Sequence, residues 1–295
     1  LRVDKHAIQM VKNIDMRADC PEIYDQGELN SCVSNAVSFM IEFIQKKYEI
    51  PHNIMPSRLY IYYNTRDSLK TIQEDSGATI IDTLISTNHD GYCSELDWMY
   101  DVTKFSVKPP NEDYISGQNH LVTKYTPLPL DINQMKQCIV NGYPFIFGIL
   151  LYTSFDGVDS DGMVSVPNEG DTLLGGHAMV CVGYDDAKQC FIVSNSWGNT
   201  WGDHGYCYIP YTYLCNPAQV FDLYYITEIN DLDFYTDTII NASYGSNTTH
   251  IDVTDIVTKY FVSGNTRMTV SNKFFGDPCY GVVKQLLVSM RNGIT

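Results

Sequence analysis

The sequence predicts an α+β fold, because helical and strand patterns occupy separate blocks of the chain. Helix-like spacing of apolar residues dominates the first half, and short β-rich runs follow from residue 143 onwards. The two patterns do not alternate, which argues against a parallel sheet built from β-α-β units. A hydrophobic content of 44% provides enough apolar surface for a folded core.

The clearest helix is predicted for residues 32–47. Its apolar residues recur at intervals of three and four and would share one face: Val33, Ala36, Val37, Met40 and Ile44. Asn30 or Ser31 can cap its start, and Lys46 and Lys47 suit the negative end of its dipole. Three further helices are predicted over residues 57–64, 79–88 and 131–141.

β-Strands are predicted from short runs rich in β-branched and aromatic residues, separated by Gly, Asp and Pro. In the middle of the chain they cover residues 143–151, 177–184, 189–194, 205–209 and 220–226. Four more, over residues 238–244, 250–254, 267–272 and 282–290, predict a small all-β module. We therefore divide the chain into an N-terminal extension (1–14), a main domain (15–230) and the small module (235–293).

Charge and hydropathy argue against two classes of function. Lys and Arg number 19 and Asp and Glu number 35, which gives a net charge of −16. Nucleic acids and anionic membranes are bound by clustered basic residues, so neither is an expected partner. The longest apolar run, residues 143–152, is about half the length that a membrane span needs. The seven histidines are scattered and no Cys/His cluster has zinc spacing, so neither a metal nor a cofactor is expected.

The chain has nine cysteines, an odd number, so at least one thiol cannot form an intrachain disulfide. Cys32 opens the clearest predicted helix. The positive end of a helix dipole lowers the pKa of a thiol and favours the nucleophilic thiolate. The alternative is that Cys32 is a small buried apolar residue, as free cysteines usually are.

Two further stretches carry polar side chains next to predicted strands. His177 stands in the sequence Gly-Gly-His-Ala at the start of an apolar strand, where the preceding Gly176 leaves space beside it. Asn195 begins the sequence Asn-Ser-Trp-Gly-Asn-Thr-Trp-Gly, which holds two of the three tryptophans. Separately, such a His is usually structural and such an Asn usually lies in a turn. Together with Cys32 they supply a nucleophile, a base and an orienting amide.

In the order and spacing of these motifs the chain resembles the papain/cathepsin family of cysteine proteases over about residues 14–228. The resemblance implies a two-lobed papain-like fold, with a helical N-terminal lobe and an antiparallel β-barrel-like lobe. It also implies that Cys32 is the nucleophile, His177 the base and Asn195 the amide that orients the imidazole. Gln26, six residues before Cys32, would join the Cys32 N–H in an oxyanion hole.

Further positions match residues that surround the reacting groups in the family. Ser76 and Gly77 resemble the glycine-bearing edge that pairs with the substrate backbone, and Gly176 is assigned to the same substrate-binding set. Trp197 resembles the tryptophan that shields the Asn–His hydrogen bond, and Trp201 the one that lines the leaving-group side of the cleft. These roles rest on the resemblance alone.

The activity that the resemblance implies is that of a cysteine endopeptidase, which hydrolyses a protein or peptide substrate through a thioester acyl-enzyme. Two alternatives stay open. One is a catalytically weak homologue that acts as a binding or structural protein, and the other is a peptide ligase that uses the same thioester. The C-terminal module either packs against the protease or binds a partner of unknown kind.

The chain also departs from most secreted members of the family. Leu29 and Asn30 stand where those have Cys and Gly, so the disulfide beside the active site cannot form, and Val33 replaces a Trp in the cleft floor. Because 14 residues precede Asp15, we expect that a helical inhibitory pro-region was either removed or never present. We expect a disulfide-poor member of microbial or viral type, from a reduced intracellular or virion compartment rather than a secreted or lysosomal one.

Overall fold

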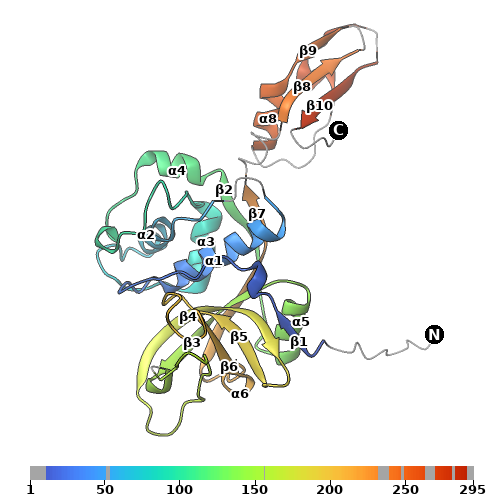
Figure 1. Ribbon diagram of the computed structural model, residues 1–295. Helices are drawn as coiled ribbons and strands as arrows, with labels where there is room; N and C mark the ends of the chain where they lie inside the picture. Colours follow the sequence, from blue (N-terminus) through green and yellow to red (C-terminus); the bar gives the residue numbers. More distant parts are fainter. Residues whose placement is uncertain are drawn as a thin grey trace, which may run out of the picture.

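The structure is a computed structural model that describes residues 11–50, 54–155, 157–231, 239–246, 249–262, 270–280 and 283–290. Figure 1 shows a body of two lobes, one helical and one built on a sheet, with a small module beyond it. This is the α+β, two-lobed arrangement that the sequence predicts.

The predicted helices of the body are confirmed. Its α-helices are α1 (Cys32–Lys47), α2 (Arg58–Ser68), α3 (Ile80–His89), α4 (Asn111–Gly117), α5 (Ile132–Val140) and α6 (Tyr211–Leu214), with short 3-10 turns at Arg17–Asp19, Val102–Lys104 and Thr153–Phe155. Helix α1 matches its predicted bounds at both ends. Helix α2 extends past residue 64 because Arg66, although polar, is buried there and donates hydrogen bonds to the carbonyls of Ile72 and Glu74.

An antiparallel sheet of seven strands forms the second lobe. Its strands are β1 (Asn13–Asp15), β2 (His120–Pro127), β3 (Phe145–Tyr152), β4 (Leu173–Asp185), β5 (Cys190–Ser194), β6 (Tyr206–Pro210) and β7 (Val220–Asp231). They lie in the order β2-β7-β3-β4-β5-β6, and β1 pairs with β4. The five predicted strands are confirmed as β3 to β7. Strand β1 is too short to show a pattern, and β2 mixes buried and exposed residues irregularly, so neither was predicted.

Helix α1 is the element that the two lobes share. It contacts α2 and α3 on one side and β3, β4 and β7 on the other. Val37 and Met40 of α1 belong to the same hydrophobic cluster as Phe145 of β3 and Val180 of β4, and all four are buried. Burial of this helix on both sides fixes the position of its first residue, Cys32, at the junction of the lobes.

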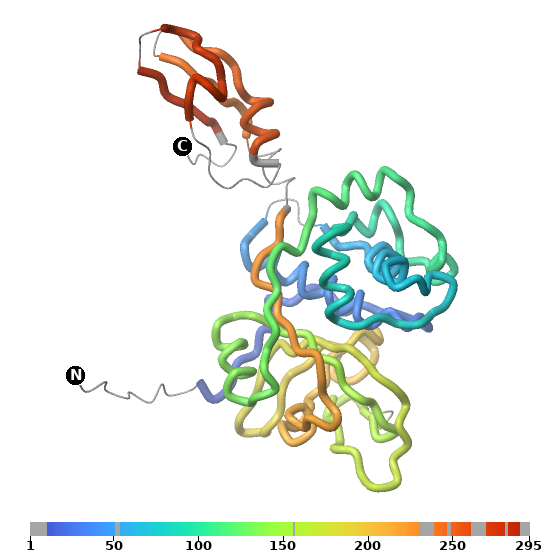
Figure 2. Tube along the Cα trace, turned by 180° about the vertical axis from the view of Figure 1, so that it is seen from behind, coloured from blue at the N-terminus to red at the C-terminus, as the bar shows by residue number. Residues whose placement is uncertain are grey.

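The C-terminal module has its own small sheet and its own core. Its elements are β8 (Ile239–Gly245), β9 (His250–Asp252), α8 (Thr254–Val262), α9 (Asn272–Phe275) and β10 (Gln285–Met290), with strand order β10-β8-β9. The buried residues form a cluster separate from that of the body: Ile239, Ala242, Tyr244, Val253, Val257 and Phe275. In Figures 1 and 2 the module stands beyond the end of the two-lobed body.

The small sheet of the module is confirmed, but the module is not all-β. Residues 254–262 form α8, whose first backbone N–H, that of Thr254, donates to the Asp252 side chain. Val253 and Val257 are buried four residues apart, which is helical spacing in a segment too short to be recognised from the sequence. Residues 267–269 of the strand predicted over residues 267–272 lie outside the described residues, whereas residues 270 and 271 are not in a strand and Asn272 begins α9.

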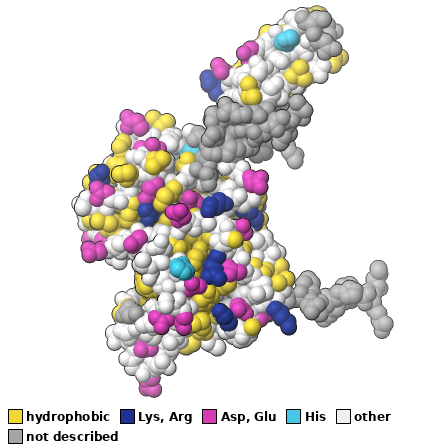
Figure 3. Space-filling model, in the orientation of Figure 1, with side chains coloured by type: hydrophobic (Ala, Val, Ile, Leu, Met, Phe, Trp, Pro, Cys, Tyr) yellow, Lys and Arg dark blue, Asp and Glu magenta, His cyan; other side chains and the backbone are white. Residues whose placement is uncertain are grey.

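The surface shows mixed charge. On the face of the body drawn in Figure 3, acidic and basic side chains are interspersed rather than gathered by sign. Among the helices that the structure describes, none has the length and apolar character that a membrane crossing requires.

We predict that the body folds without the module. A chain that ends at Asp231 should unfold within about 4 °C of the full chain, because the two hydrophobic clusters share no residue and about 4 °C corresponds to about 1 kcal/mol for a domain of this size. Thermal unfolding followed by circular dichroism would measure this. A larger decrease would instead support the hypothesis that the module packs against the protease and stabilises it.

Candidate active site

Cys32 is the first residue of α1, and Ser31 occupies the N-cap position. The positive end of a 16-residue helix therefore faces the thiol. Burial is the largest influence on the Cys32 side chain and raises the pKa of its thiol. The backbone N–H groups of Ala178 and Val33 act in the opposite direction, because they hydrogen-bond the thiolate.

His177 lies in β4 and is hydrogen-bonded to Asn195, which follows β5. Strand pairing brings them together, since Val180 of β4 lies opposite Ser194 of β5. The distance from His177 Nε2 to Asn195 Oδ1 is 2.8 Å, and the backbone N–H of Ser196 donates to the same oxygen at 2.8 Å. An amide oxygen only accepts hydrogen bonds, so His177 carries its proton on Nε2 and leaves Nδ1 as an acceptor.

An aromatic ring, itself part of a small aromatic cluster, packs against the histidine. The ring of Trp197 lies 5.0 Å from that of His177, centroid to centroid, and is tilted by 32°. Trp201 meets Trp197 edge-on at 5.2 Å and stacks on Phe155 at 5.7 Å. Burial lowers the pKa of His177 to about 4, although the hydrogen bond with Asn195 opposes this shift. A neutral imidazole is therefore the resting form at ordinary pH.

The side-chain amide of Gln26 is held at both ends. Its Oε1 accepts a hydrogen bond from Ser196 Oγ at 2.6 Å, and its Nε2 donates to the Leu29 carbonyl at 2.8 Å. An amide nitrogen carries two protons, so one N–H is left for another acceptor. Gln26 and Cys32 both line the same cleft.

The cleft has a volume of about 850 Å³ and contains most of the predicted site residues. Cys32 and His177 lie in it together with Gln26 and Val33. The helical lobe supplies one wall and the β lobe the other: Ser76, Gly77, Ala78, Thr79 and Ile80 on the first, and Gly148, Gly175, Gly176 and Phe221 on the second. Trp201 is not among the lining residues and belongs to the aromatic cluster around Trp197.

Phe221 is a residue of the cleft that the sequence did not reveal. It is the second residue of β7, opposite Gly148 of β3, and is 44% exposed. A Cβ built on Gly148 would lie 2.4 Å from Phe221 Cε2, so the ring occupies the space that the glycine leaves empty. Gly148 and Phe221 are far apart in the sequence, and only the pairing of β3 with β7 brings them into contact. No local sequence pattern indicates this contact.

Asn30 ties the loop before Cys32 to the opposite edge of the cleft. Its backbone N–H donates to the Asp75 carboxylate at 3.1 Å, and its side-chain amide donates to the Asp75 carbonyl at 2.8 Å. The Tyr62 hydroxyl also donates to Asp75 and accepts from the Gly77 N–H at 3.2 Å. We call this group of four residues the Asn30–Asp75 clasp. It connects the segment around the thiol to the glycine-bearing edge.

The described residues contain neither a disulfide nor a group of metal ligands. All nine cysteines are free thiols, and Cys181 is buried in β4. Within the described part of the chain, no three His, Cys, Asp or Glu side chains are grouped in a way that could hold a metal ion.

Comparison with known proteins shows which family the chain belongs to. The model of the papain family cysteine proteases matches residues 10–220. An uncharacterised peptidase C1-like protein of Acanthamoeba polyphaga mimivirus is 37% identical over 217 residues, which cover 70% of this chain and 70% of that protein. A probable cysteine protease of Arabidopsis thaliana is 27% identical over 218 residues, covering 67% of this chain and 54% of that protein.

Solved structures extend the comparison to the fold. Xylellain, a cysteine protease from Xylella fastidiosa, superimposes with a TM-score of 0.69 at 35% identity, covering 74% of this chain and 86% of that one. Bromelain from Ananas comosus, in complex with the E64 inhibitor, gives a TM-score of 0.56 at 19% identity, covering 74% of this chain and 99% of that one, and shows the fold alone. On these grounds the chain belongs to the papain family of cysteine proteases and is a cysteine-type peptidase.

Proposed function

We propose that the protein is a cysteine endopeptidase that uses Cys32 as nucleophile, His177 as base and Asn195 as the amide that orients the imidazole. The observation that carries this proposal is the 2.8 Å contact between His177 Nε2 and Asn195 Oδ1 in the cleft that also holds Cys32 at the start of α1. This contact leaves Nδ1 of His177 unprotonated, which a general base requires.

The reaction begins from an uncharged pair, since burial raises the pKa of Cys32 and lowers that of His177. As the sulfur attacks the peptide carbonyl, the thiol proton moves to His177 Nδ1 and the carbonyl electron pair moves to oxygen. The positive end of α1 stabilises the charge that develops on sulfur. His177 then protonates the departing amine as the C–N bond breaks, and water hydrolyses the thioester with His177 again acting as base.

The oxyanion is held by two donors in this proposal, the second Nε2–H of Gln26 and the backbone N–H of Cys32. Each such donor contributes roughly 3–4 kcal/mol to transition-state stabilisation. Ser196 and Leu29 fix the Gln26 amide before substrate arrives, so little reorganisation is needed.

Substrate would lie along the glycine-bearing edge. Gly77 has no side chain, so an extended peptide can approach its backbone closely, beside Ser76 and opposite Gly176. Phe221 and Ile80 give the cleft apolar walls that suit an apolar substrate side chain. Trp197 covers the His177 ring and limits access of water to its bond with Asn195.

Cys32 should react with an epoxide or vinyl-sulfone reagent much faster than the other eight thiols, because they are not placed at a helix N-terminus beside a histidine. Mass spectrometry of the labelled peptides would identify the reactive residue. Cys32→Ala should abolish peptide hydrolysis, whereas Cys279→Ala, which changes a thiol of the module, should preserve it. Equal labelling of all thiols, or an active Cys32→Ala variant, would contradict the proposed mechanism. Products joined to an added amine would indicate ligation instead.

The free energy of unfolding should decrease as the pH falls from about 6.5 to about 4. The folded protein keeps His177 neutral down to about pH 4, whereas the unfolded imidazole binds a proton near 6.5. The unfolded state therefore binds more protons in this interval, and lower pH favours it. Urea unfolding at several pH values would measure the slope. His177→Gln, which removes the titrating group, should reduce this slope, and an unchanged slope would contradict the burial of a neutral imidazole.

Phe221→Ala should widen the accepted range of substrate side chains. Removing the ring opens the cleft above Gly148, so kcat/KM for peptides with bulky apolar side chains should rise relative to small ones, by about tenfold or more. A peptide series varied at each position before the scissile bond would measure the ratio. Phe274→Ala is the matched control, since Phe274 is 42% exposed and lies in the module. An unchanged ratio in Phe221→Ala would show that Phe221 does not limit specificity.

A further inference from the structure

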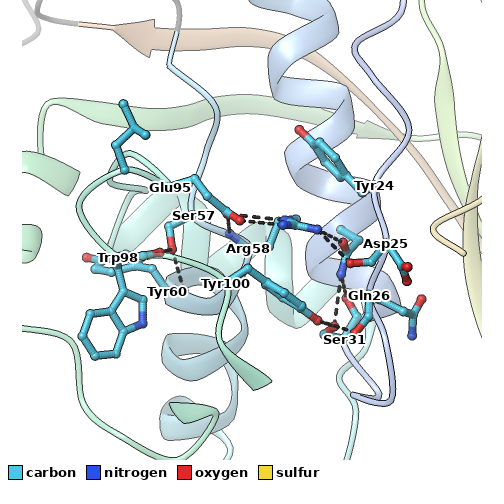
Figure 4. Close-up of polar contacts among 12 residues, drawn as sticks. Tyr24, Asp25, Gln26, Ser31, Ser57, Arg58, Tyr60, Glu95, Trp98 and Tyr100 are labelled. Carbon is cyan, nitrogen blue, oxygen red and sulfur yellow. Dashed lines mark hydrogen bonds and ion pairs between the residues drawn. The ribbon is translucent and has the colours of Figure 1, made fainter. Parts of the chain in front are cut away.

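The segment of residues 25–31, which has no regular secondary structure, contains one proposed oxyanion donor, Gln26, and leads directly into the other, the N–H of Cys32. On one side it is tied to the segment after Asn195: the backbone N–H of Gln26 donates to the Ser196 carbonyl at 2.9 Å, and that of Gly198 donates to the Tyr24 carbonyl at 2.9 Å. On its other side the segment faces the helical lobe. Polar side chains from α2 and from residues 95–100 meet it there, as Figure 4 shows.

Arg58 is the centre of this second set of contacts. Although charged, it is 8% exposed and is paired with Glu95, with Nη2 of the guanidinium 2.5 Å from Oε1 of the carboxylate. Nη1 of the same group donates to the Asp25 carbonyl at 3.1 Å and to Asn35 Oδ1 at 3.1 Å. The planar guanidinium thus joins a carboxylate of the lobe to the loop and to α1 at the same time.

Asn35 passes this constraint to the peptide group that contains the Cys32 N–H. Its Nδ2 donates to the Ser31 carbonyl at 2.9 Å, and its backbone N–H donates to the same oxygen at 3.1 Å. In a trans peptide the C=O and the N–H point in opposite directions. A Ser31 carbonyl held toward Asn35 therefore fixes the Cys32 N–H on the opposite side.

Tyr100 passes the same constraint to Gln26. Its hydroxyl donates to the Gln26 carbonyl at 2.9 Å, so it must accept the hydrogen bond from Ser31 Oγ, which lies 2.5 Å away. Ser31 Oγ in turn accepts from Asn35 Nδ2 at 3.1 Å. Every bond in this chain therefore donates in one direction, from Arg58 toward the Gln26 backbone. Such aligned chains reinforce one another in a buried setting.

We propose that Arg58, acting through Asn35 and Tyr100, is a positioning residue that aims both oxyanion donors, the Gln26 amide and the Cys32 N–H. The inference rests on the proposed function, because it assigns these residues a task in stabilising the tetrahedral intermediate. Arg58 also packs against the rings of Tyr100 and Tyr24, 4.1 and 4.8 Å from their centroids, which holds its guanidinium in the plane that all the acceptors require.

The test compares peptide hydrolysis with alkylation of Cys32 by iodoacetamide. Alkylation displaces iodide from a saturated carbon and forms no oxyanion, so it reports on the thiol alone. Tyr100→Phe removes one hydroxyl, and Arg58→Lys keeps a positive charge beside Glu95 but cannot reach every acceptor at once. Each should lower kcat by roughly ten- to a hundredfold, which is less than the loss of a whole oxyanion donor, with KM and the alkylation rate unchanged.

Tyr60→Phe is the matched control. Tyr60 is a buried tyrosine of the same lobe whose hydroxyl donates to the Asp90 carbonyl at 3.0 Å, away from the loop, so its loss should change neither rate. An unchanged kcat in Tyr100→Phe and Arg58→Lys would overturn the inference while leaving the proposed function intact. Alkylation that falls in parallel with kcat would overturn it too, because the contacts would then support the fold or the thiol in general. A wild-type protein that hydrolyses no peptide would overturn the proposed function, and this inference with it.

Discussion

The shared burial of helix α1 is the constraint on which the rest of the structure depends. The helix begins at Cys32, and its buried residues, among them Val37 and Met40, pack between the helices of one lobe and the sheet of the other. His177 lies on β4 of the same sheet, and β4 contacts α1 directly. The placement of thiol and imidazole is therefore set by close packing of the core, and a displacement of either one would require the core itself to repack.

Burial also determines which protonation states Cys32 and His177 favour. A closed site disfavours both a thiolate and an imidazolium, as the raised pKa of Cys32 and the lowered pKa of His177 indicate. The groups that favour charge are fixed dipoles: the first turn of α1, the N–H of Ala178 and the oxygen of Asn195. Dipoles held by the fold need no reorganisation when charge appears, so they act most strongly when proton transfer and attack occur together.

The sequence predicted what local pattern and chemistry can encode. The repeated apolar spacing predicted both ends of α1 correctly. The order and motifs of Gln26, Cys32, His177 and Asn195, through the resemblance to the family, made these four residues the candidates for the site, and the structure places His177 and Asn195 in contact. The remaining features depend on tertiary register. Phe221 enters the cleft only through the pairing of β7 with β3, and no periodicity near it signals that contact. Helix α8 escaped prediction because nine residues beside a strand pattern give too few turns for a helical period to emerge.

The Asn30–Asp75 clasp bears on the disulfide that the chain lacks. A disulfide acts largely by restricting the unfolded chain, whereas hydrogen bonds to a carboxylate exist only once the loop and the glycine-bearing edge have met. The contacts of Asn30 and Tyr62 with Asp75 can thus order this part of the cleft without an oxidant. The absence of a disulfide also excludes one reaction of the thiol. A thiolate attacks disulfide sulfur readily, and with all nine cysteines free Cys32 has no neighbouring disulfide with which to exchange. If Cys32 is the nucleophile, as we propose, a cleft held by hydrogen bonds therefore leaves its thiolate with no intrachain disulfide to attack.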